Sequence, residues 1–483
     1  MIFNSLSFLA FIALFFPIYF SLRRKARLLF CLAASYFFYA YWDWRFLTLI
    51  IFSTVVDYAI GLKMNELEQN KFNEKLLQKQ KKRLLLLSLI TNLGFLAFFK
   101  YFNFFLTSFQ DLLLSIGLES STRSLQIILP VGISFYTFQS MSYTIDVYRK
   151  HIPVERNFWK FATYISFFPQ LVAGPIVRAK DFLPQFDRPR RFDWTRFMSG
   201  WSQVIWGFFK KIVVADSLAP FVDQCFEMPE AFSSLHLMLG IFFYSFQIYC
   251  DFSGYSDIAI GLARMMGFDF PPNFKTPYFS KSFSEFWTRW HITLSSWLRD
   301  YLYIPLGGNR YGSFRTFRNL MITMLLGGLW HGASWVFVFW GFLHGSYLIL
   351  QRLLQPIFNS FWQWIAAPQF IREGVSILLV YLLTCFAWVF FRSPDFETAG
   401  YYLDIIFSFE DLSPSSIINK FMVLKCSFLI LFLLLVEISN FRFQYATALL
   451  HRPILRLFAF ATLLWMIAFF GTFGSNAFIY FQF

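Results

Sequence analysis

Apolar runs of about 20 residues, long enough to cross a bilayer as helices, recur along the whole chain. One of them, Phe3–Leu22, stands near the start, and others continue into the last hundred residues. Of the 483 residues, 57% are hydrophobic and 14% are charged, so there is too little polar surface to cover a water-soluble globule of this size. The sequence therefore predicts an all-α polytopic membrane protein with about eleven transmembrane or re-entrant helices.

The net charge of +14 comes from 42 Lys and Arg residues against 28 Asp and Glu residues. In a membrane protein this excess is expected in cytoplasmic loops and beside anionic lipid headgroups, so no nucleic-acid partner is predicted. The five cysteines stand singly in apolar stretches without CxxC spacing. We interpret them as small buried hydrophobic residues.

The distribution of positive charge predicts the orientation of the first spans. The basic cluster Arg23–Arg27 follows the first apolar run, whereas a secretory signal peptide carries its positive charge before that run. We therefore expect an uncleaved anchor with its N-terminus outside the cytoplasm. The polar, lysine-rich stretch Lys63–Arg83 is expected to be cytoplasmic.

Two later segments are not predicted to be simple transmembrane helices. Ile127–Val147 is rich in Ser, Thr and Gln and is interrupted near its start by Pro130 and Gly132, which predicts a helix facing a cavity. Phe158–Leu171 is followed by the basic loop Arg178–Arg196, which strict alternation of spans would place outside. Because that position conflicts with the charge of the loop, one of the two segments is predicted to be re-entrant.

A polar group follows the apolar run Leu235–Tyr249. It comprises Asp251, Tyr255 and Asp257 with Gln247 and Ser253. Two interpretations remain open at this stage, a loop with capping carboxylates or the polar wall of a cavity. No His or Cys stands at metal-ligand spacing from the two aspartates, so no metal site is predicted.

A helix is predicted to begin at Ser282, which forms an S-x-x-E capping box with Glu285. From Trp287 through Trp290 to Tyr301, apolar residues recur at helical spacing on one stripe. Such a stripe suits a helix at the membrane interface or at the mouth of a funnel. His291 lies at its edge, where a histidine either packs through a hydrogen bond or takes part in chemistry.

The apolar run Met321–Ile349 contains the strongest candidate for a functional residue. His331 lies there between Gly328 and Gly332. Burying a histidine in a membrane segment is costly, so a function is the default explanation for such a residue. The glycines allow another backbone or a ligand to approach the imidazole closely. The alternative is tight helix packing, which needs no histidine. His344, at the far end of the run, is interpreted as a packing residue.

These residues also carry a resemblance. The segments ILPVGISFYTFQSMSYTIDVYR, FPQLVAGPIVR, WTRWHITLSSWLRDYLYIPLGGNR and GGLWHG occur in this order. Together they resemble the membrane-bound O-acyltransferase (MBOAT) superfamily, and within it the bacterial branch that holds the alginate O-acetyltransferase membrane subunit. The signature histidine of the family maps onto His331 and its second histidine onto His291.

The resemblance implies a single membrane domain, residues 1–483, built around a central funnel. Its parts would be N-terminal spans in 1–125, a catalytic core in 126–350 and C-terminal spans in 351–483. The implied activity is O-acylation, with His331 as general base and His291 as a partner that orients or polarises a reactant. Substrate contacts are predicted at seven further residues, which are Trp287, Trp290, Trp330, Gly328, Gly332, Asp251 and Tyr255.

The implied acyl donor is acetyl-CoA, arriving from the cytoplasm as a substrate, with no cofactor held by the protein. The implied acceptor is an envelope or exported polysaccharide similar to alginate, reached directly or through a secreted partner acetyltransferase. Membrane lipid is the other expected partner, and the cell inner membrane is the expected location. Peptidoglycan O-acetylation and D-alanyl transfer to teichoic acid are the alternatives within the family.

Two alternatives from other classes are a membrane transporter and a non-catalytic export scaffold. A transporter tends to show an internal repeat between its halves, and none is visible in this sequence. A scaffold would keep its activity without His331. Substitution of that histidine therefore separates an enzyme from a scaffold.

Overall fold

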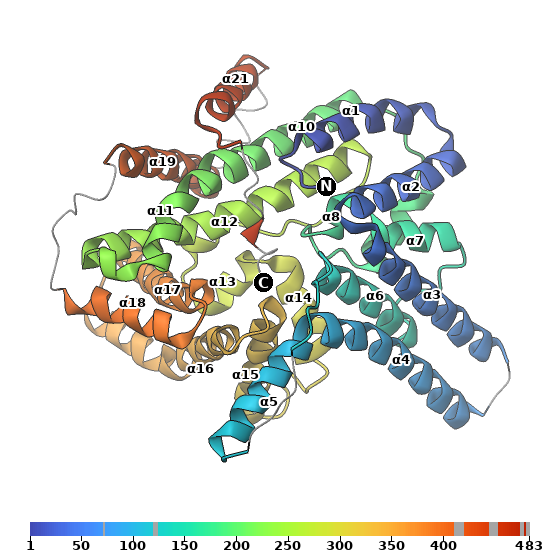
Figure 1. The fold of residues 1–483 in the computed structure, drawn as a ribbon, viewed down its shortest axis with the longest axis horizontal. Helices are drawn as coiled ribbons and strands as arrows, with labels where there is room; N and C mark the ends of the chain where they lie inside the picture. The colour runs from blue at the N-terminus through green and yellow to red at the C-terminus, as the bar shows by residue number, and fades with distance from the viewer. Residues whose placement is uncertain (71–72, 119–123, 410–419, 444–452, 474–477, 480–483) are drawn as a thin grey trace. The chain divides into compact units, whose positions relative to one another are not determined.

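The computed structural model describes residues 1–70, 73–118, 124–409, 420–443, 453–473 and 478–479. Throughout these residues the regular elements are helices, which confirms the all-α class (Figure 1). The chain forms two compact units. The first comprises Met1–Trp201 with Ala259–Pro271, and the second comprises Ser202–Ile258 with Pro272–Phe483.

The helices of the first unit are α1 (Leu6–Ser21), α2 (Arg24–Asp43), α3 (Leu47–Gln69), α4 (Glu74–Leu96), α5 (Phe102–Ser115), α6 (Ile133–Tyr148), α7 (Phe158–Ser166), α8 (Phe168–Leu171) and α9 (Ala179–Phe182). Helix α10 (Trp194–Phe208) begins in the first unit and ends in the second, and α12 (Ser234–Met265) runs in the opposite order.

The remaining helices belong to the second unit: α11 (Asp216–Glu227), α13 (Phe283–Arg289), α14 (Ile292–Leu298), α15 (Ser313–His331), α16 (Trp335–Trp364), α17 (Gln369–Arg392), α18 (Phe396–Ser408), α19 (Lys420–Phe443) and α21 (Pro453–Phe470). Two π-helical turns also matter for the site, Phe209–Ala215 after α10 and Arg299–Tyr303 after α14.

Within the described residues, five helical stretches are long and apolar enough to cross a membrane, which supports a multi-pass protein. They are Arg24–Gln69, Glu74–Ser115, Ser234–Met265, Gln369–Arg392 and Lys420–Ser439, with Leu6–Ser21 and Ile454–Phe470 as shorter apolar helices. Arg24–Gln69 holds both α2 and α3, which the turn Trp44–Phe46 separates. The count of about eleven membrane segments stays a prediction.

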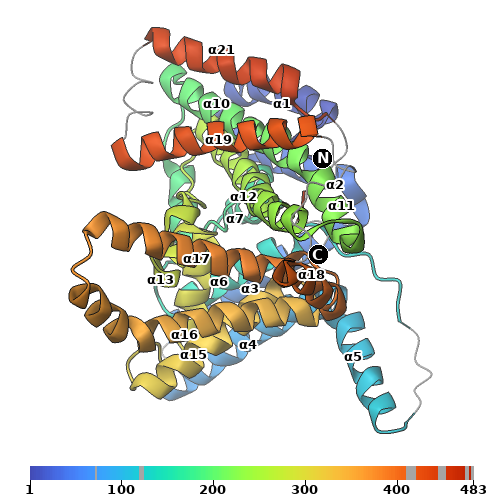
Figure 2. The same cartoon turned by 90° about the vertical axis from the view of Figure 1, so that its left-hand side faces the viewer.

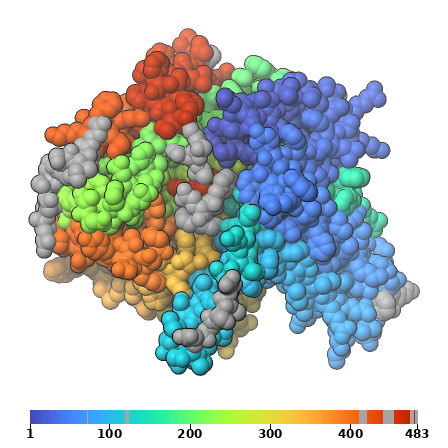
Figure 3. All heavy atoms as spheres, viewed as in Figure 1, coloured from blue at the N-terminus to red at the C-terminus, as the bar shows by residue number. Residues whose placement is uncertain are grey.

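The outer faces of α1 and α2 are apolar. Figure 3 shows these helices, in dark blue, at the surface of the first unit. Leu6, Leu14 and Phe37 are 85%, 69% and 56% exposed. Side chains of this kind suit contact with lipid tails, so these two helices form part of the lipid-facing surface of their unit.

Helix α6 is the polar segment for which the sequence predicts contact with a cavity. It packs against α3 and α4, and nearly all its side chains are buried. Ser140 on α6, together with Ser88 and Asn92 on α4, donates hydrogen bonds to the carboxylate of Asp57 on α3. At Ser140 the polar face of α6 meets another helix and not a cavity, because Asp57 on α3 accepts the hydrogen bond of this hydroxyl.

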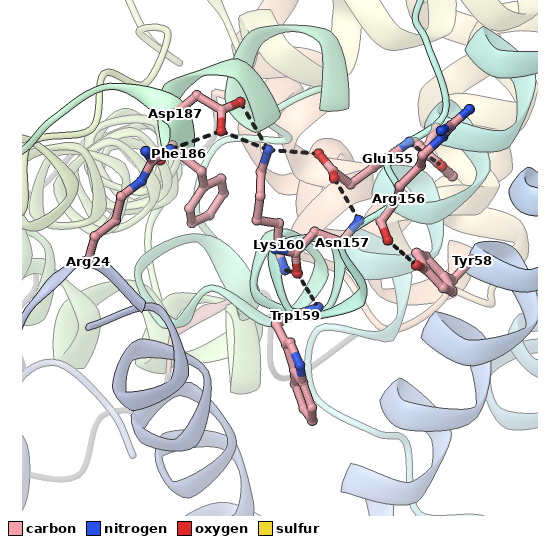
Figure 4. Close-up of polar contacts among 10 residues, drawn as sticks. Arg24, Tyr58, Glu155, Arg156, Asn157, Trp159, Lys160, Phe186 and Asp187 are labelled. Carbon is pink, nitrogen blue, oxygen red and sulfur yellow. Dashed lines mark hydrogen bonds and ion pairs between the residues drawn. The ribbon is translucent and has the colours of Figure 1, made fainter. Parts of the chain in front are cut away.

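The segment Phe158–Leu171 turns back on itself. It forms α7 and α8, of nine and four residues, which are too short to cross a bilayer. Lys160, at the start of α7, binds Asp187 in the following loop at 3.0 Å and Glu155 at 2.9 Å (Figure 4). These ion pairs tie the two flanks of the segment together, as a re-entrant hairpin requires, and re-entrance itself stays a prediction.

Four basic segments of the first unit lie on one face. Arg24 forms an ion pair with Asp187 at 3.0 Å, and Arg27 donates to the backbone oxygen of Arg190 at 2.7 Å. Glu68 binds both Lys81 and Lys150. Together with the ion pairs of Lys160, these bonds link residues 23–27, 63–83, 149–157 and 178–196, and a re-entrant hairpin would remove the conflict between their charge and strict alternation.

We expect this face to be cytoplasmic and the N-terminus to lie outside, because positive charge is retained on the cytoplasmic side. A cysteine at Asn73, which caps α4, tests this orientation. In intact cells the N73C variant should resist a membrane-impermeant thiol reagent and should react after the cells are opened. The five native cysteines are all buried, so they give a low background. Labelling of N73C in intact cells would show that the orientation is inverted.

Candidate functional site

Helices α15 and α16 form the hairpin that holds the signature histidine. They lie side by side in both views (Figures 1 and 2). A Cβ atom at Gly328 would lie 2.2 Å from the backbone oxygen of Phe337, and one at Gly341 would lie 2.3 Å from that of Met324. No side chain fits at either position, so these glycines let the two backbones touch.

His331 occupies the last position of α15, which ends there because Gly332 adopts an extended backbone. Its side chain is buried, and its ring meets those of Trp330, Trp340 and Phe391 at centroid distances of 5.1, 5.0 and 5.4 Å. A Cβ atom at Gly332 would overlap the ring of Phe337. The histidine is thus held by uncharged rings at the point where the hairpin turns.

His291 breaks the helix that the sequence predicts from Trp287 to Tyr301. The capping box of Ser282 and Glu285 starts α13 as expected, with Glu285 donating its N–H to the Ser282 hydroxyl at 3.1 Å. The helix ends at Arg289, and His291 has a left-handed backbone with φ = +42° before α14 begins. Strain of this kind at a non-glycine residue is typical of functional sites.

Asn273, on the loop after α12, holds this left-handed turn in place. Its backbone oxygen accepts the N–H of Ile292 at 2.9 Å, and its side-chain oxygen accepts that of Thr293 at 3.2 Å. The amide also lies 3.1 Å from Nδ1 of His291. These are the first N–H groups of α14, which the side chain of His291 does not cap.

The structure brings His291 and His331 together from different elements. Their ring centroids are 6.4 Å apart, and Trp330 contacts both rings. Since a hydrogen bond needs about 3 Å between heavy atoms, the two imidazoles are too far apart to bond directly. Burial lowers the pKa of His291 to about 3, so this imidazole is neutral at neutral pH.

The tryptophans predicted to contact substrate have different environments. Trp290 is fully buried and stacks on Phe286 at 5.7 Å, whereas Trp287 is partly exposed and packs edge-on against Trp340. Trp330 is buried beside both histidines. Contact with substrate stays a prediction for all three tryptophans. It also stays a prediction for Gly328 and Gly332, and packing between α15 and α16 explains why glycine stands at these two positions.

His344 is fully buried and packs edge-on against Trp340 at 4.7 Å and Trp287 at 5.1 Å. Neither ring nitrogen of His344 forms a hydrogen bond to a described residue, so pairing with a backbone carbonyl is not observed. Trp340 separates this ring from that of His331. Its surroundings fit the predicted packing role.

The polar group around Asp251, Tyr255 and Asp257 lies within the continuous helix α12, so the loop interpretation is wrong. The carboxylate of Asp251 accepts hydrogen bonds from the ammonium of Lys211 and from the N–H of Ile479. The ring of Tyr255 packs on Phe478 at 5.0 Å. Both predicted substrate contacts are thus occupied by protein, and a role toward substrate remains a prediction.

Sequence reasoning missed the partners of these carboxylates. Lys210 and Lys211, on the π-helical turn Phe209–Ala215, are buried and form ion pairs with Asp257 and Asp251 on α12. Two adjacent lysines inside an apolar run are a signal for buried acidic partners, because an isolated ammonium is costly there. Asn273 was also missed, since nothing in its local sequence distinguishes it.

Among the described residues, no group of three or more His, Cys, Asp or Glu side chains is placed to hold a metal ion. The arrangement instead offers two imidazoles from different helices, uncharged aromatic walls and a strained turn beside them. Such a pair suits proton transfer to or from a hydroxyl.

Comparison with known proteins places these features in a family. Residues 15–391 match the membrane-bound O-acyltransferase family. The chain is 42% identical over 456 residues to a probable alginate O-acetylase of Azotobacter vinelandii, covering 94% of this chain and 87% of that protein. It is 36% identical to a peptidoglycan O-acetyltransferase of Helicobacter pylori, covering 83% and 78%. A teichoic acid D-alanyltransferase of Streptococcus thermophilus is 30% identical, covering 46% and 56%.

Proposed function

Because the chain belongs to the membrane-bound O-acyltransferase family, we propose that it transfers acetyl groups for O-acetylation of an envelope or exported polysaccharide. The observation that supports this choice most is the similarity over 94% of the chain to a protein described as a probable alginate O-acetylase. The donor in this proposal is acetyl-CoA, which reaches the site from the cytoplasm as a substrate.

His331 acts as the general base. The acceptor hydroxyl gives its proton to the imidazole as its oxygen attacks the thioester carbonyl carbon, and the ester C–O bond forms. As the C–S bond breaks, the imidazolium returns the proton to the leaving thiolate, so no net proton is consumed. The uncharged rings of Trp330, Trp340 and Phe391 surround His331.

His291 assists by orienting or polarising a reactant. Its ring lies 6.4 Å from that of His331 by centroids, which supports a role of both histidines in one reaction. The proposed acceptor is the polymer itself or a secreted partner acetyltransferase. The proposed location is the cell inner membrane, where a cytoplasmic donor and an external acceptor meet the protein from opposite sides.

Peptidoglycan O-acetylation is the second candidate, and the similarity to the Helicobacter pylori protein over 83% of this chain supports it. The D-alanyltransferase of Streptococcus thermophilus covers only 46% of this chain, which favours D-alanyl transfer less. Acetyl and D-alanyl esters are both released by mild base, so the released acid identifies the acyl group.

The test is deletion of the gene followed by mild-base release of acyl groups from separated envelope fractions. We expect acetate to disappear from the polysaccharide fraction, to remain in the peptidoglycan fraction, and to return when the gene is restored. Loss confined to peptidoglycan would favour the second candidate. Loss of released D-alanine, or no loss in any fraction, would contradict acetyl transfer.

A further inference from the structure

Asn273 is a buried polar side chain that bonds several groups of the site. It is 1% exposed, and its side-chain oxygen accepts hydrogen bonds from the hydroxyl of Thr293 at 2.9 Å and from the backbone N–H of Thr293 at 3.2 Å. Its side-chain nitrogen donates to the hydroxyl of Ser256 on α12 at 3.1 Å. Together these bonds fix the amide in one orientation.

The orientation of this amide determines the tautomer of His291. A backbone N–H can only donate, so the atom that faces Thr293 must be the amide oxygen, which only accepts. Nδ1 of His291 lies 3.1 Å from the same oxygen, so Nδ1 carries a hydrogen and donates it. A neutral imidazole has one N–H, and therefore Nε2 holds the lone pair.

The same residue also fixes the position of the ring. Asn273 secures both backbone N–H groups that follow the left-handed His291, and loss of these bonds would release the strained turn. The ring is packed edge-on by Phe252 at 4.5 Å and lies near Phe274, Trp330 and His331. Among these described rings, that of His331 is titratable.

We infer that Asn273 is a positioning residue for acyl transfer, which holds His291 as a hydrogen-bond acceptor through Nε2. This inference rests on the proposed function. It assigns His291 an orienting role, because a nitrogen with a lone pair receives a substrate O–H or N–H and cannot polarise the thioester carbonyl. The attacking hydroxyl still gives its proton to His331. His291 therefore accepts a hydrogen bond from a different O–H or N–H group, which belongs either to the acceptor substrate or to acetyl-CoA.

The test compares four variants in membranes supplied with radiolabelled acetyl-CoA and the base-deacetylated polymer. N273L removes every side-chain hydrogen bond and should lower the turnover rate by about 10-fold to 100-fold. T293V keeps the backbone N–H and should stay near the wild-type rate. N319L is the matched control, because Asn319 is a buried asparagine on α15, twelve residues before His331, that bonds the backbone oxygen of Gly308.

N273D supplies a readout that a purely structural role would not move. The carboxylate accepts the same hydrogen bonds, but its negative charge stabilises the imidazolium and raises the pKa of His291, typically by about 1–3 units. Because protonation of Nε2 removes its lone pair, the pH at which the nitrogen-15 signal of His291 titrates should move to higher pH in N273D. In N319L this titration should not move.

The Michaelis constants show which substrate carries the O–H or N–H group that His291 binds. A raised KM for acetyl-CoA in N273L would assign that group to the acyl donor, and a raised KM for the polymer would assign it to the acceptor. A wild-type rate in N273L, or an unmoved titration of His291 in N273D, would overturn the inference.

Nitrogen-15 solid-state NMR of histidine-labelled protein, with H291Q to assign the signal, tests the tautomer without any activity. We expect a protonated Nδ1 and an unprotonated Nε2 in the wild type. The opposite tautomer would overturn the inference even if acetyl transfer is confirmed. Absence of acetyl transfer in wild-type membranes would contradict the proposed function alone, because the tautomer is measured independently.

Discussion

Replacing His331 with alanine is expected to lower acetyl transfer by about 10²–10⁴-fold, the usual contribution of a positioned general base. The described aromatic rings around His331, those of Trp330, Trp340 and Phe391, carry no group that can replace this base. The measurement is the acetate released from purified polymer, normalised to the amount of protein in the membrane.

A control is needed because truncating a buried ring also destabilises a protein. His236 belongs to the same unit, is similarly buried and bonds the hydroxyl of Ser233 at 2.6 Å. H236A should therefore lose a comparable amount of packing and retain acetyl transfer. Wild-type acetylation in H331A would contradict the catalytic assignment and would favour an export scaffold.

The second large effect is expected from combining substitutions at the two histidines. H291A should lower the rate substantially and leave measurable activity, because water replaces part of a lost hydrogen bond at a cost of about 1–3 kcal/mol. H331A with H291A should be scarcely worse than H331A alone, since residues that act as one unit give non-additive losses. Their ring centroids, 6.4 Å apart, place them close enough for such coupling.

The measurement is the initial rate of acetyl transfer from acetyl-CoA in membranes that contain matched amounts of each variant. If the two losses multiply, the histidines act independently and the shared-site interpretation fails. Wild-type behaviour of H291A would return His291 to a packing role.

Periodicity and composition were enough to predict the helical class, the capping box at Ser282 and the close packing that Gly328 permits. They were not enough to predict the break at His291. The apolar stripe continues through that position, and no local preference signals a left-handed histidine. The turn is held by Asn273, eighteen residues earlier, so its cause lies in tertiary contacts.

The polar residues of α12 show the same limit. Asp251 and Asp257 look like loop residues because carboxylates are disfavoured inside a membrane helix. Their partners, Lys211 and Lys210, stand 40 or more residues earlier on another element. A sequence pattern read locally cannot supply that pairing, although the adjacent lysines in an apolar run were a usable signal.

The pairing of Lys210 and Lys211 with α12 also constrains how the protein is made. A lysine at the centre of a membrane helix costs about 2.5–3.5 kcal/mol to insert. The segment that ends in these two lysines is therefore inserted into the bilayer inefficiently without a partner. Asp216, on the next helix, pairs with Lys211 at 2.9 Å, but Asp251 and Asp257 leave the ribosome roughly 40 residues after the lysines, on α12. We therefore expect the two segments to wait at the translocation machinery and to enter the bilayer as a preassembled pair.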